Sequence, residues 1–558
     1  MPTAATAFDD LGFGPYPNDR ASARYPVYTR GNAGEVYPEV VYPFGLSLSR
    51  SVPDPVRRSM IAGRGFSRRD LAGEAEFGVN SGVFAGYMYL NLSIMRRLAA
   101  RVPGVTLADF DAAVLGAEAA AAPHVPAPGE RNPLRTLGIV REGLRAMRAT
   151  ALPELDADKA EAARLRHGPS WVAAATDDEL VARIEGLVPV AMAMFERHLS
   201  VSGHATSSLV LLRQQVDKIL GDPAPAMTLL SGIGDVESAD PARRLWHLSR
   251  LDPATPDFSR AFDEFLDLHG ARGPNEWEIA CPTWGTDPAL ALALVDRLRA
   301  GGDRQSPEAR AAALADERRH TLEQVRAAAG RLQLAGFERL LRFATLYSQG
   351  RERAKTTVIN VIHHQRLAAV ELGRRLAARG GHGSDLWFCY RHELDAVRAD
   401  PAAFVDTAAA RRATRAELAA RIPPFVFDGE IPPPATWQRR DERTLDPAAP
   451  GTVLTGTSGG SGHATGVARV VLDPSHDTRL GPGTILVAPH TDPAWTPLFL
   501  GVDAVVVDVG GQVSHAVIVA RELGLPCVVG VTDATARIPD GATITVDGDR
   551  GTVRVDAH

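Results

Sequence analysis

The chain has almost no lysine. Only three of its 61 basic residues are lysines, namely Lys159, Lys218 and Lys355, and arginine supplies the rest. The formal net charge of −6 is also unlike the strongly basic balance of nucleic-acid-binding domains. We therefore expect no nucleic-acid partner, and a lysine retained in this arginine-rich chain is a candidate for a specific task.

Cysteine is also scarce, and long apolar runs are absent. The three cysteines (Cys281, Cys389 and Cys527) lie far apart, which excludes a disulfide framework and a cysteine-based zinc site. No run of eighteen apolar residues occurs, and the N-terminus has neither the basic region nor the apolar core of a signal peptide. We expect a cytoplasmic protein with no membrane partner and no bound metal.

The patterning predicts a multidomain protein. Residues 1–23 read as an irregular tail, and residues 24–423 show the three- and four-residue apolar spacing of a large, mainly α-helical domain. Residues 424–451 are rich in proline and charge and are predicted to form a linker. Residues 452–558 alternate short β-branched strands with turns and one helix, which predicts a compact C-terminal α/β domain.

One short segment of the C-terminal domain carries a chemical signature. Val502–Val509 is predicted to be a buried strand, Gly510 and Gly511 allow a sharp turn, and Ser514 stands where a helix N-cap would. His515 then falls in the first helical turn, where free N–H groups and the helix dipole favour an anion. The same field disfavours imidazolium, so a neutral, nucleophilic imidazole that accepts a phosphoryl group is predicted. The alternative is a histidine that merely caps a helix.

Gly510–Gly530 resembles the phosphohistidine swivelling domain of the PEP-utilising enzymes, which include pyruvate phosphate dikinase, phosphoenolpyruvate synthase and rifampicin phosphotransferase. Thr491–Leu498 and Gly466–Val471 are similar to two further blocks of that domain, and the resemblance covers residues 453–556. It implies that His515 carries the phosphoryl group, with Gly510, Gly511 and Ser514 forming the turn that binds it.

The helical part resembles the substrate domain of rifampicin phosphotransferase-like enzymes over residues 24–440. Tyr28–Pro38 is similar to the opening block of that domain, and Leu268–Ile279 to a second block. The resemblance makes Asn32 and Glu35 candidates for substrate binding. The alternative is that they belong to a turn that ties down the N-terminal segment.

A third block starts at Gln349, where we expect a helix to begin. Arg351 and Lys355 are four residues apart and share a helix face, which costs about 0.2–0.5 kcal/mol unless an anion lies between them. The family resemblance assigns both to phosphoryl stabilisation, with Glu352 orienting the pair or binding Lys355, and we count Glu352 among the substrate-binding candidates. The alternative is an exposed basic helix start.

The resemblance implies a phosphotransferase that depends on a partner. The sequence shows neither a Walker A pattern nor an ATP-grasp pattern, so we expect ATP and Mg²⁺ to bind to a separate ATP-grasp protein that loads His515. The phosphoryl group would then pass to a small, apolar substrate that bears a hydroxyl or carboxyl group. Two alternatives stay open: a non-catalytic phosphohistidine carrier, and an enzyme that phosphorylates its substrate transiently for condensation or dehydration.

Overall fold

The computed structural model describes residues 16–63, 65–74, 80–115, 122–126, 129–166, 168–233, 240–300, 306–443, 445–472, 480–491, 495–511 and 514–557. Residues 1–15 of the expected tail lie outside these ranges, as do Asp492–Ala494 and Gln512–Val513 within two of the motifs. Residues 16–23 have no regular secondary structure. Among the described residues, every helix is too short or too polar to cross a lipid bilayer.

The N-terminal part contains a small antiparallel sheet that the helical pattern did not predict. Its strands are β1 (Val27–Thr29), β2 (Ser81–Phe84), β3 (Tyr87–Asn91) and β4 (Val426–Asp428), in the order β2-β3-β1-β4. Aromatic rings pack on it, and Tyr28 stacks on Phe427 with 5.3 Å between ring centroids.

The prediction that residues 424–451 form a linker is wrong for the first half of the segment, which contains strand β4. This strand pairs with β1 along its whole length, and Phe427 is buried in the aromatic cluster. The contacts continue to Arg440, whose N–H donates to the carbonyl of Ala420. The prolines and charges suggested a free segment, but the apolar side chains among them anchor its first half to the sheet.

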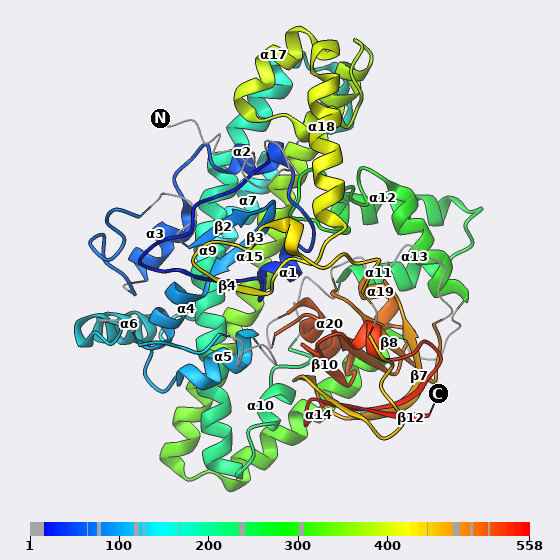
Figure 1. The fold of residues 1–558 in the computed structure, drawn as a ribbon. Coiled ribbons are helices and arrows are strands. Elements are labelled where there is room, and N and C mark those ends of the chain that lie inside the picture. Colours follow the sequence, from blue (N-terminus) through cyan, green and yellow to red (C-terminus); the bar gives the residue numbers. More distant parts are fainter. Residues whose placement is uncertain are drawn as a thin grey trace.

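Two long helices run side by side through the helical part of the molecule (Figure 1). Helix α9 (Asp177–Leu220) has 44 residues and α15 (Arg331–Ala377) has 47, so they are about 66 and 70 Å long. The expected helix start at Gln349 is wrong, because α15 runs straight through Gly350. A Cβ at Gly350 would lie 2.5 Å from Leu152, so this glycine permits a close approach of α7 (Pro153–Arg164) rather than a break.

The remaining helices of the N-terminal part surround this pair and the small sheet. They are α1 (Ala33–Val36), α2 (Pro43–Ser49), α3 (Pro55–Ala62), α4 (Leu92–Ala99), α5 (Leu107–Leu115), α6 (Pro133–Ala146), α8 (Pro169–Ala174), α10 (Pro225–Thr228), α11 (Asp240–Ser249), α12 (Pro256–His269), α13 (Pro288–Ala300), α14 (Pro307–Ala328), α16 (Asp385–Phe388), α17 (Leu394–Ala399) and α18 (Pro401–Ala419). Short 3₁₀ turns span Arg391–Glu393 and Pro434–Thr436.

The C-terminal part is built on one eight-stranded mixed sheet in the order β5-β12-β11-β7-β8-β9-β10-β6. The strands are β5 (Val453–Thr455), β6 (Thr457–Gly460), β7 (His463–Val470), β8 (Thr484–Ala488), β9 (Ala504–Val507), β10 (Cys527–Val529), β11 (Thr543–Asp547) and β12 (Thr552–Ala557). Strands β7 to β10 run parallel. Helices α19 (Thr496–Phe499), α20 (His515–Leu523) and α21 (Ala534–Arg537) accompany them, and α20 connects β9 to β10. The predicted fold class, a large helical part plus a C-terminal α/β part, is confirmed.

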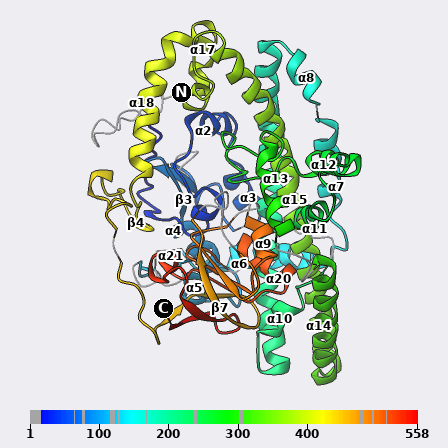
Figure 2. The same ribbon diagram turned by 90° about the vertical axis from the view of Figure 1, so that its right-hand side faces the viewer.

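The C-terminal part lies against the lower half of the long helices, beside α10, α11 and α14 (Figures 1 and 2). One buried apolar cluster is continuous across this junction. It joins residues of the helical part (Leu245, Leu294, Val295, Phe337) to residues of the C-terminal part (Leu486, Trp495, Phe499, Val517, Leu523). The structure therefore shows the C-terminal part docked through an apolar surface.

Candidate functional site

The turn that holds His515 follows the carboxyl end of strand β9. Ser514 N–H donates to the carbonyl of Gly511 (2.9 Å), and the Ser514 hydroxyl accepts the N–H of Val517 (3.5 Å) as the N-cap of α20. Gly510 has no room for a side chain, since a Cβ there would lie 2.9 Å from Val529 Cβ. His515 is the first residue of the helix, as the sequence predicted.

The His515 side chain is partly exposed, and its Nε2 lies 3.1 Å from the Thr496 hydroxyl. Thr496 begins α19, which follows β8, while His515 follows β9. Strands β8 and β9 are adjacent and parallel, so both side chains lie beyond the carboxyl edge of the sheet, the usual place for a site in such sheets. The sequence reasoning assigned no role to Thr496, although it lies in the recognised Thr491–Leu498 block.

The predicted cations lie in the middle of α15 and not at a helix start. Arg351 Nη1 is 3.3 Å from Glu352 Oε1, which agrees with the predicted orienting contact. Lys355 Nζ, however, pairs with Glu276 Oε1 at 3.2 Å. Arg272 Nη1 reaches the same carboxylate oxygen at 2.9 Å. Two cations thus share Glu276, which is only 2% exposed.

Glu276 and Arg272 were missed as site residues, although they belong to the recognised Leu268–Ile279 block. Their signal was the Arg-x-x-x-Glu spacing, which brings the two side chains together. Glu276 Oε2 has no hydrogen-bond partner among the described residues. A buried oxygen of this kind is normally satisfied, so it is a natural contact for a ligand or an ordered water beside Lys355.

The electrostatics of this cluster keep Glu352 charged and His198 neutral. Burial opposes ionisation of Glu352, but Arg351, Lys355 and Arg272 together lower its pKa below the usual value. Burial, aided by Arg351 and Lys355, lowers the pKa of His198 to about 3. Neither Glu352 nor His198 therefore accepts a proton readily near neutral pH.

Glu35 connects the cluster to the turn that presents His515. Its Oε1 accepts the N–H of Gly511 at 3.1 Å, across the junction between the two parts of the chain. Burial raises the pKa of Glu35 to about 8, although the Gly511 N–H, Arg351 and Lys355 all act to lower it. Asn32 is exposed, and its backbone has a left-handed φ of 63° at the start of α1. Its carbonyl accepts the Glu35 N–H, so its visible contribution is to shape the turn.

The segment before Glu35 is rigidly supported. The Arg30 guanidinium donates to the carbonyls of Met88, Tyr37 and Pro38 and lies 4.9 Å from the Tyr87 ring centroid. Arg30 is only 7% exposed, so these contacts hold the turn against β3. The Thr-Arg-x-Asn-x-Gly-Glu pattern thus builds a platform for Glu35.

Two cavities border the docked C-terminal part. One of about 50 Å³ lies beside Arg351 and Glu352 and is closed from the other side by Ile518, Arg521 and Glu522 of α20. Its volume has room for a few water molecules but not for a drug-sized ligand, which needs at least ~300 Å³.

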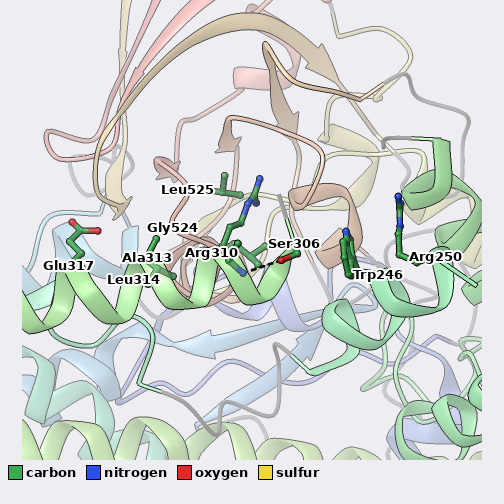
Figure 3. Close-up of a pocket in the computed structure, with 11 residues that line it drawn as sticks. Trp246, Arg250, Ser306, Arg310, Ala313, Leu314, Glu317, Gly524 and Leu525 are labelled. Carbon is green, nitrogen blue, oxygen red and sulfur yellow. Dashed lines mark hydrogen bonds between the residues drawn. The ribbon is translucent and has the colours of Figure 1, made fainter. Parts of the chain in front are cut away.

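The second cavity is larger, about 940 Å³, and lies between α11, α14 and the end of α20. Figure 3 shows Trp246 and Arg250 at one end of it and Arg310 and Glu317 along α14. It contains none of the predicted site residues.

A possible metal-ligand group lies elsewhere on the sheet. Among the described residues, the ligand atoms of His463, Asp547 and Asp549 lie within 4.8 Å of one another. Both imidazole nitrogens of His463 already face carboxylates, at 3.1 and 3.6 Å, and Asp547 also accepts the Arg550 N–H. His463 and Asp549 are exposed, so the group is explained as a surface ion-pair cluster.

Comparison with known protein families agrees with the geometry. Residues 480–551 match the family "PEP-utilising enzyme, mobile domain", and residues 197–352 match "Rifampicin phosphotransferase fourth domain". The first match contains Thr496, Gly511 and His515, and the second contains His198, Arg351 and Glu352. The chain therefore carries the mobile domain of the PEP-utilising enzymes together with a domain of the rifampicin phosphotransferase type, and the resemblance noted from the sequence is confirmed.

Curated relatives align with more than half of the chain. A protein named rifampicin phosphotransferase from a Streptomyces species is 30% identical over 368 residues, which is 64% of this chain and 40% of that protein. An uncharacterised Mycobacterium tuberculosis protein is 34% identical over 57% of this chain and 33% of its own length. The prodigiosin synthesizing transferase PigC of Serratia marcescens is 31% identical over 56% of this chain and 35% of its own length. The chain thus spans about a third to two fifths of these relatives.

Proposed function

We propose that this chain is the phosphoryl-carrying and acceptor-binding part of a phosphotransferase system. His515 accepts a phosphoryl group and passes it to the hydroxyl or carboxyl group of a small, apolar acceptor. The observation that carries the proposal is the placement of His515 at the helix N-terminus, on a mobile-domain fold, with its turn docked through Glu35 against the Arg351–Lys355 face of α15.

The proposed chemistry follows from charge placement. A phosphoryl group on His515 lies at the N-terminus of α20, where the helix dipole stabilises an anion. When the acceptor oxygen attacks phosphorus, negative charge spreads over the equatorial oxygens. Arg351 supplies a forked donor and Lys355 a point charge for those oxygens. Positioning and charge stabilisation provide the rest of the catalysis.

The phosphoryl donor is proposed to be ATP with Mg²⁺, bound by an ATP-grasp partner. Loading is proposed to require that the mobile domain leaves the position seen here, because Glu35 binds its turn and Arg351 and Glu352 of α15 face α20. The hinge is proposed to lie between Arg440, which binds Ala420 of the helical part, and Arg443, which pairs with Asp533 of the C-terminal part. The names of two relatives, rifampicin phosphotransferase and a prodigiosin synthesizing transferase, support a small-molecule acceptor. The word "synthesizing" in the second name supports the alternative in which the chain phosphorylates its substrate only transiently.

The proposal is tested with radiolabelled ATP and an ATP-grasp protein encoded beside this chain. We expect label on the wild-type chain and none on His515→Ala. Adding a candidate acceptor should discharge the label into a small molecule. Labelling of His515→Ala equal to that of the wild type would refute the role of His515. Product without retained phosphate would select the activating alternative.

A further inference from the structure

The contact between Glu35 and the mobile domain has a consequence for proton transfer. Transfer from phosphohistidine to an acceptor hydroxyl forms a P–O bond and breaks the P–N bond. The imidazole nitrogen recovers its electron pair, and the hydroxyl loses a proton. A base beside the phosphoryl group is required to receive that proton.

Most titratable groups of the site are unsuited to this role. Glu352 is held ionised by Arg351, which makes it a weak base, and Oε1 of Glu276 is already occupied by Lys355 and Arg272. His198 is buried against the Phe195 and Trp277 rings, at 6.0 and 5.9 Å, among the same cations. Glu522 faces Arg521 and Glu352, seven residues beyond His515 along α20.

Glu35 differs from these groups in position and in partners. Glu35 contacts the turn that presents His515. It accepts the N–H of Gly511, and the carbonyl of Gly511 in turn accepts the N–H of Ser514. From α15 it faces Arg351 and Lys355, but within the described residues no ion pair to Glu35 forms. The docked position desolvates its carboxyl group, while the residue keeps part of its surface open to solvent.

We propose that Glu35 is the proton acceptor for the attacking hydroxyl, held at the mobile-domain turn by the Gly511 N–H and by the platform that Arg30 supports. This inference rests on the proposed function. When the hydroxyl attacks, its proton passes to the Glu35 carboxylate, the P–N bond breaks and the imidazole nitrogen keeps the electron pair. Undocking of the mobile domain then exposes the carboxyl group, which returns the proton to water. The pKa near 8 suits this cycle, since the carboxyl binds a proton when docked and loses it when hydrated.

The test needs neither the partner nor the natural acceptor. The full chain is phosphorylated chemically with potassium phosphoramidate, and loss of phosphate from the His515 peptide is followed by mass spectrometry from pH 6 to 9, with water as acceptor. The reference is the same chain unfolded in urea. Hydrolysis of free phosphohistidine slows as the pH rises, because it needs a proton on the imidazole. A rate that rises with pH therefore identifies a protein base.

We expect the wild-type rate to exceed the unfolded reference and to rise with pH as Glu35 titrates, until release of the mobile domain at the upper end of the range lowers it again. Glu35→Gln keeps an oxygen for the Gly511 N–H but takes no proton, so it should be at least tenfold slower at pH 8 and should lose the rise. Glu35→Asp should restore part of both. The control, Glu39→Gln, changes a nearby exposed carboxyl that pairs with Arg415 and should behave as the wild type.

The outcomes separate the two ideas. If Glu35→Gln discharges like the wild type with the same pH profile, Glu35 only docks the turn and the inference is overturned, while the proposed function stands. If the wild type discharges no faster than the unfolded reference and no acceptor removes the phosphate, the proposed function itself has failed.

Discussion

At the residue scale, substitution of a cation on α15 should slow transfer of the phosphoryl group to the acceptor without affecting phosphorylation of His515. Lys355 is 16% exposed and pairs with Glu276, and its charge also acts on Glu35, which binds the docked turn. Replacing Lys355 by Met should leave phosphorylation of His515 intact but slow transfer to the acceptor by about 10²–10³-fold, the usual cost of losing one charge-stabilising donor. The measurement is single-turnover discharge of labelled protein. Lys159→Gln, at an exposed position, is the control.

Arginine and lysine should not be interchangeable at position 351. A guanidinium donates two parallel hydrogen bonds to phosphoryl oxygens, whereas an ammonium donates from a single point. We expect Arg351→Lys to retain the contact with Glu352 but to slow discharge by at least tenfold. Equal discharge rates for Arg351→Lys and the wild type would show that only the charge matters.

At the element scale, the N-terminus of α20 depends on its N-cap, Ser514. Ser514 caps the helix, and losing such a cap costs about 0.5–2 kcal/mol. Ser514→Ala should therefore lower the stability of the mobile domain by about 1 kcal/mol, measured by hydrogen exchange of α20 amides. Exchange unchanged from the wild type would mean that the 3.5 Å contact contributes little.

Much at this scale could be read from the sequence. The strand–turn–helix signature gave the positions of Gly510, Ser514 and His515 because every local preference there agrees with the fold. The start of α15 was misread because Gly350 is a packing residue rather than a helix end. Strand β4 was missed because three residues carry too little periodicity, and its partner β1 lies about 400 residues earlier.

The sequence also predicted those site residues that are close together in the chain but not the contacts between distant ones. Arg351, Glu352 and Lys355 are local in sequence and were found together. The links from Lys355 to Glu276 and from Glu35 to Gly511 join residues 79 and 476 positions apart, which no local pattern reveals. Sequence reasoning named Glu35 as a substrate contact, and the structure shows it against the mobile domain.

At the scale of the whole molecule, the docked arrangement depends on an apolar junction. Leu314 of α14 is 8% exposed and lies against Gly524 at the end of α20. Removing a buried leucine side chain costs about 2–5 kcal/mol, and a charge in its place costs at least as much. Leu314→Asp should therefore release the mobile domain, seen as a larger radius of gyration in small-angle X-ray scattering. Leu332→Asp, at a 91% exposed leucine, should not.

Docking should also depend on pH. Burial raises the pKa of Glu35 to about 8 and that of Glu522 to about 7, from an ordinary value of 4.5. The docked state thus holds protons that the released state gives up, so docking weakens as the pH rises through this range. His490, whose pKa burial lowers to about 4, acts in the opposite direction but only below about 6.5.

Between pH 6.5 and 8, the pH dependence of docking should therefore come from Glu35 and Glu522 without a contribution from His490. We expect the radius of gyration of the wild type to increase across this range and that of the double variant Glu35→Gln/Glu522→Gln to change much less. An equal increase in both proteins would assign the pH dependence to other groups.

The most direct measurement is the phosphorylation state of one side chain. The chain is incubated with ATP, Mg²⁺ and its ATP-grasp partner, kept at alkaline pH and digested, and the peptide that contains His515 is examined by mass spectrometry. We predict a phosphate on His515 that disappears on brief acid treatment and is absent from His515→Ala. A peptide that stays unmodified while the acceptor is nevertheless phosphorylated would contradict the role of His515 as the phosphoryl carrier.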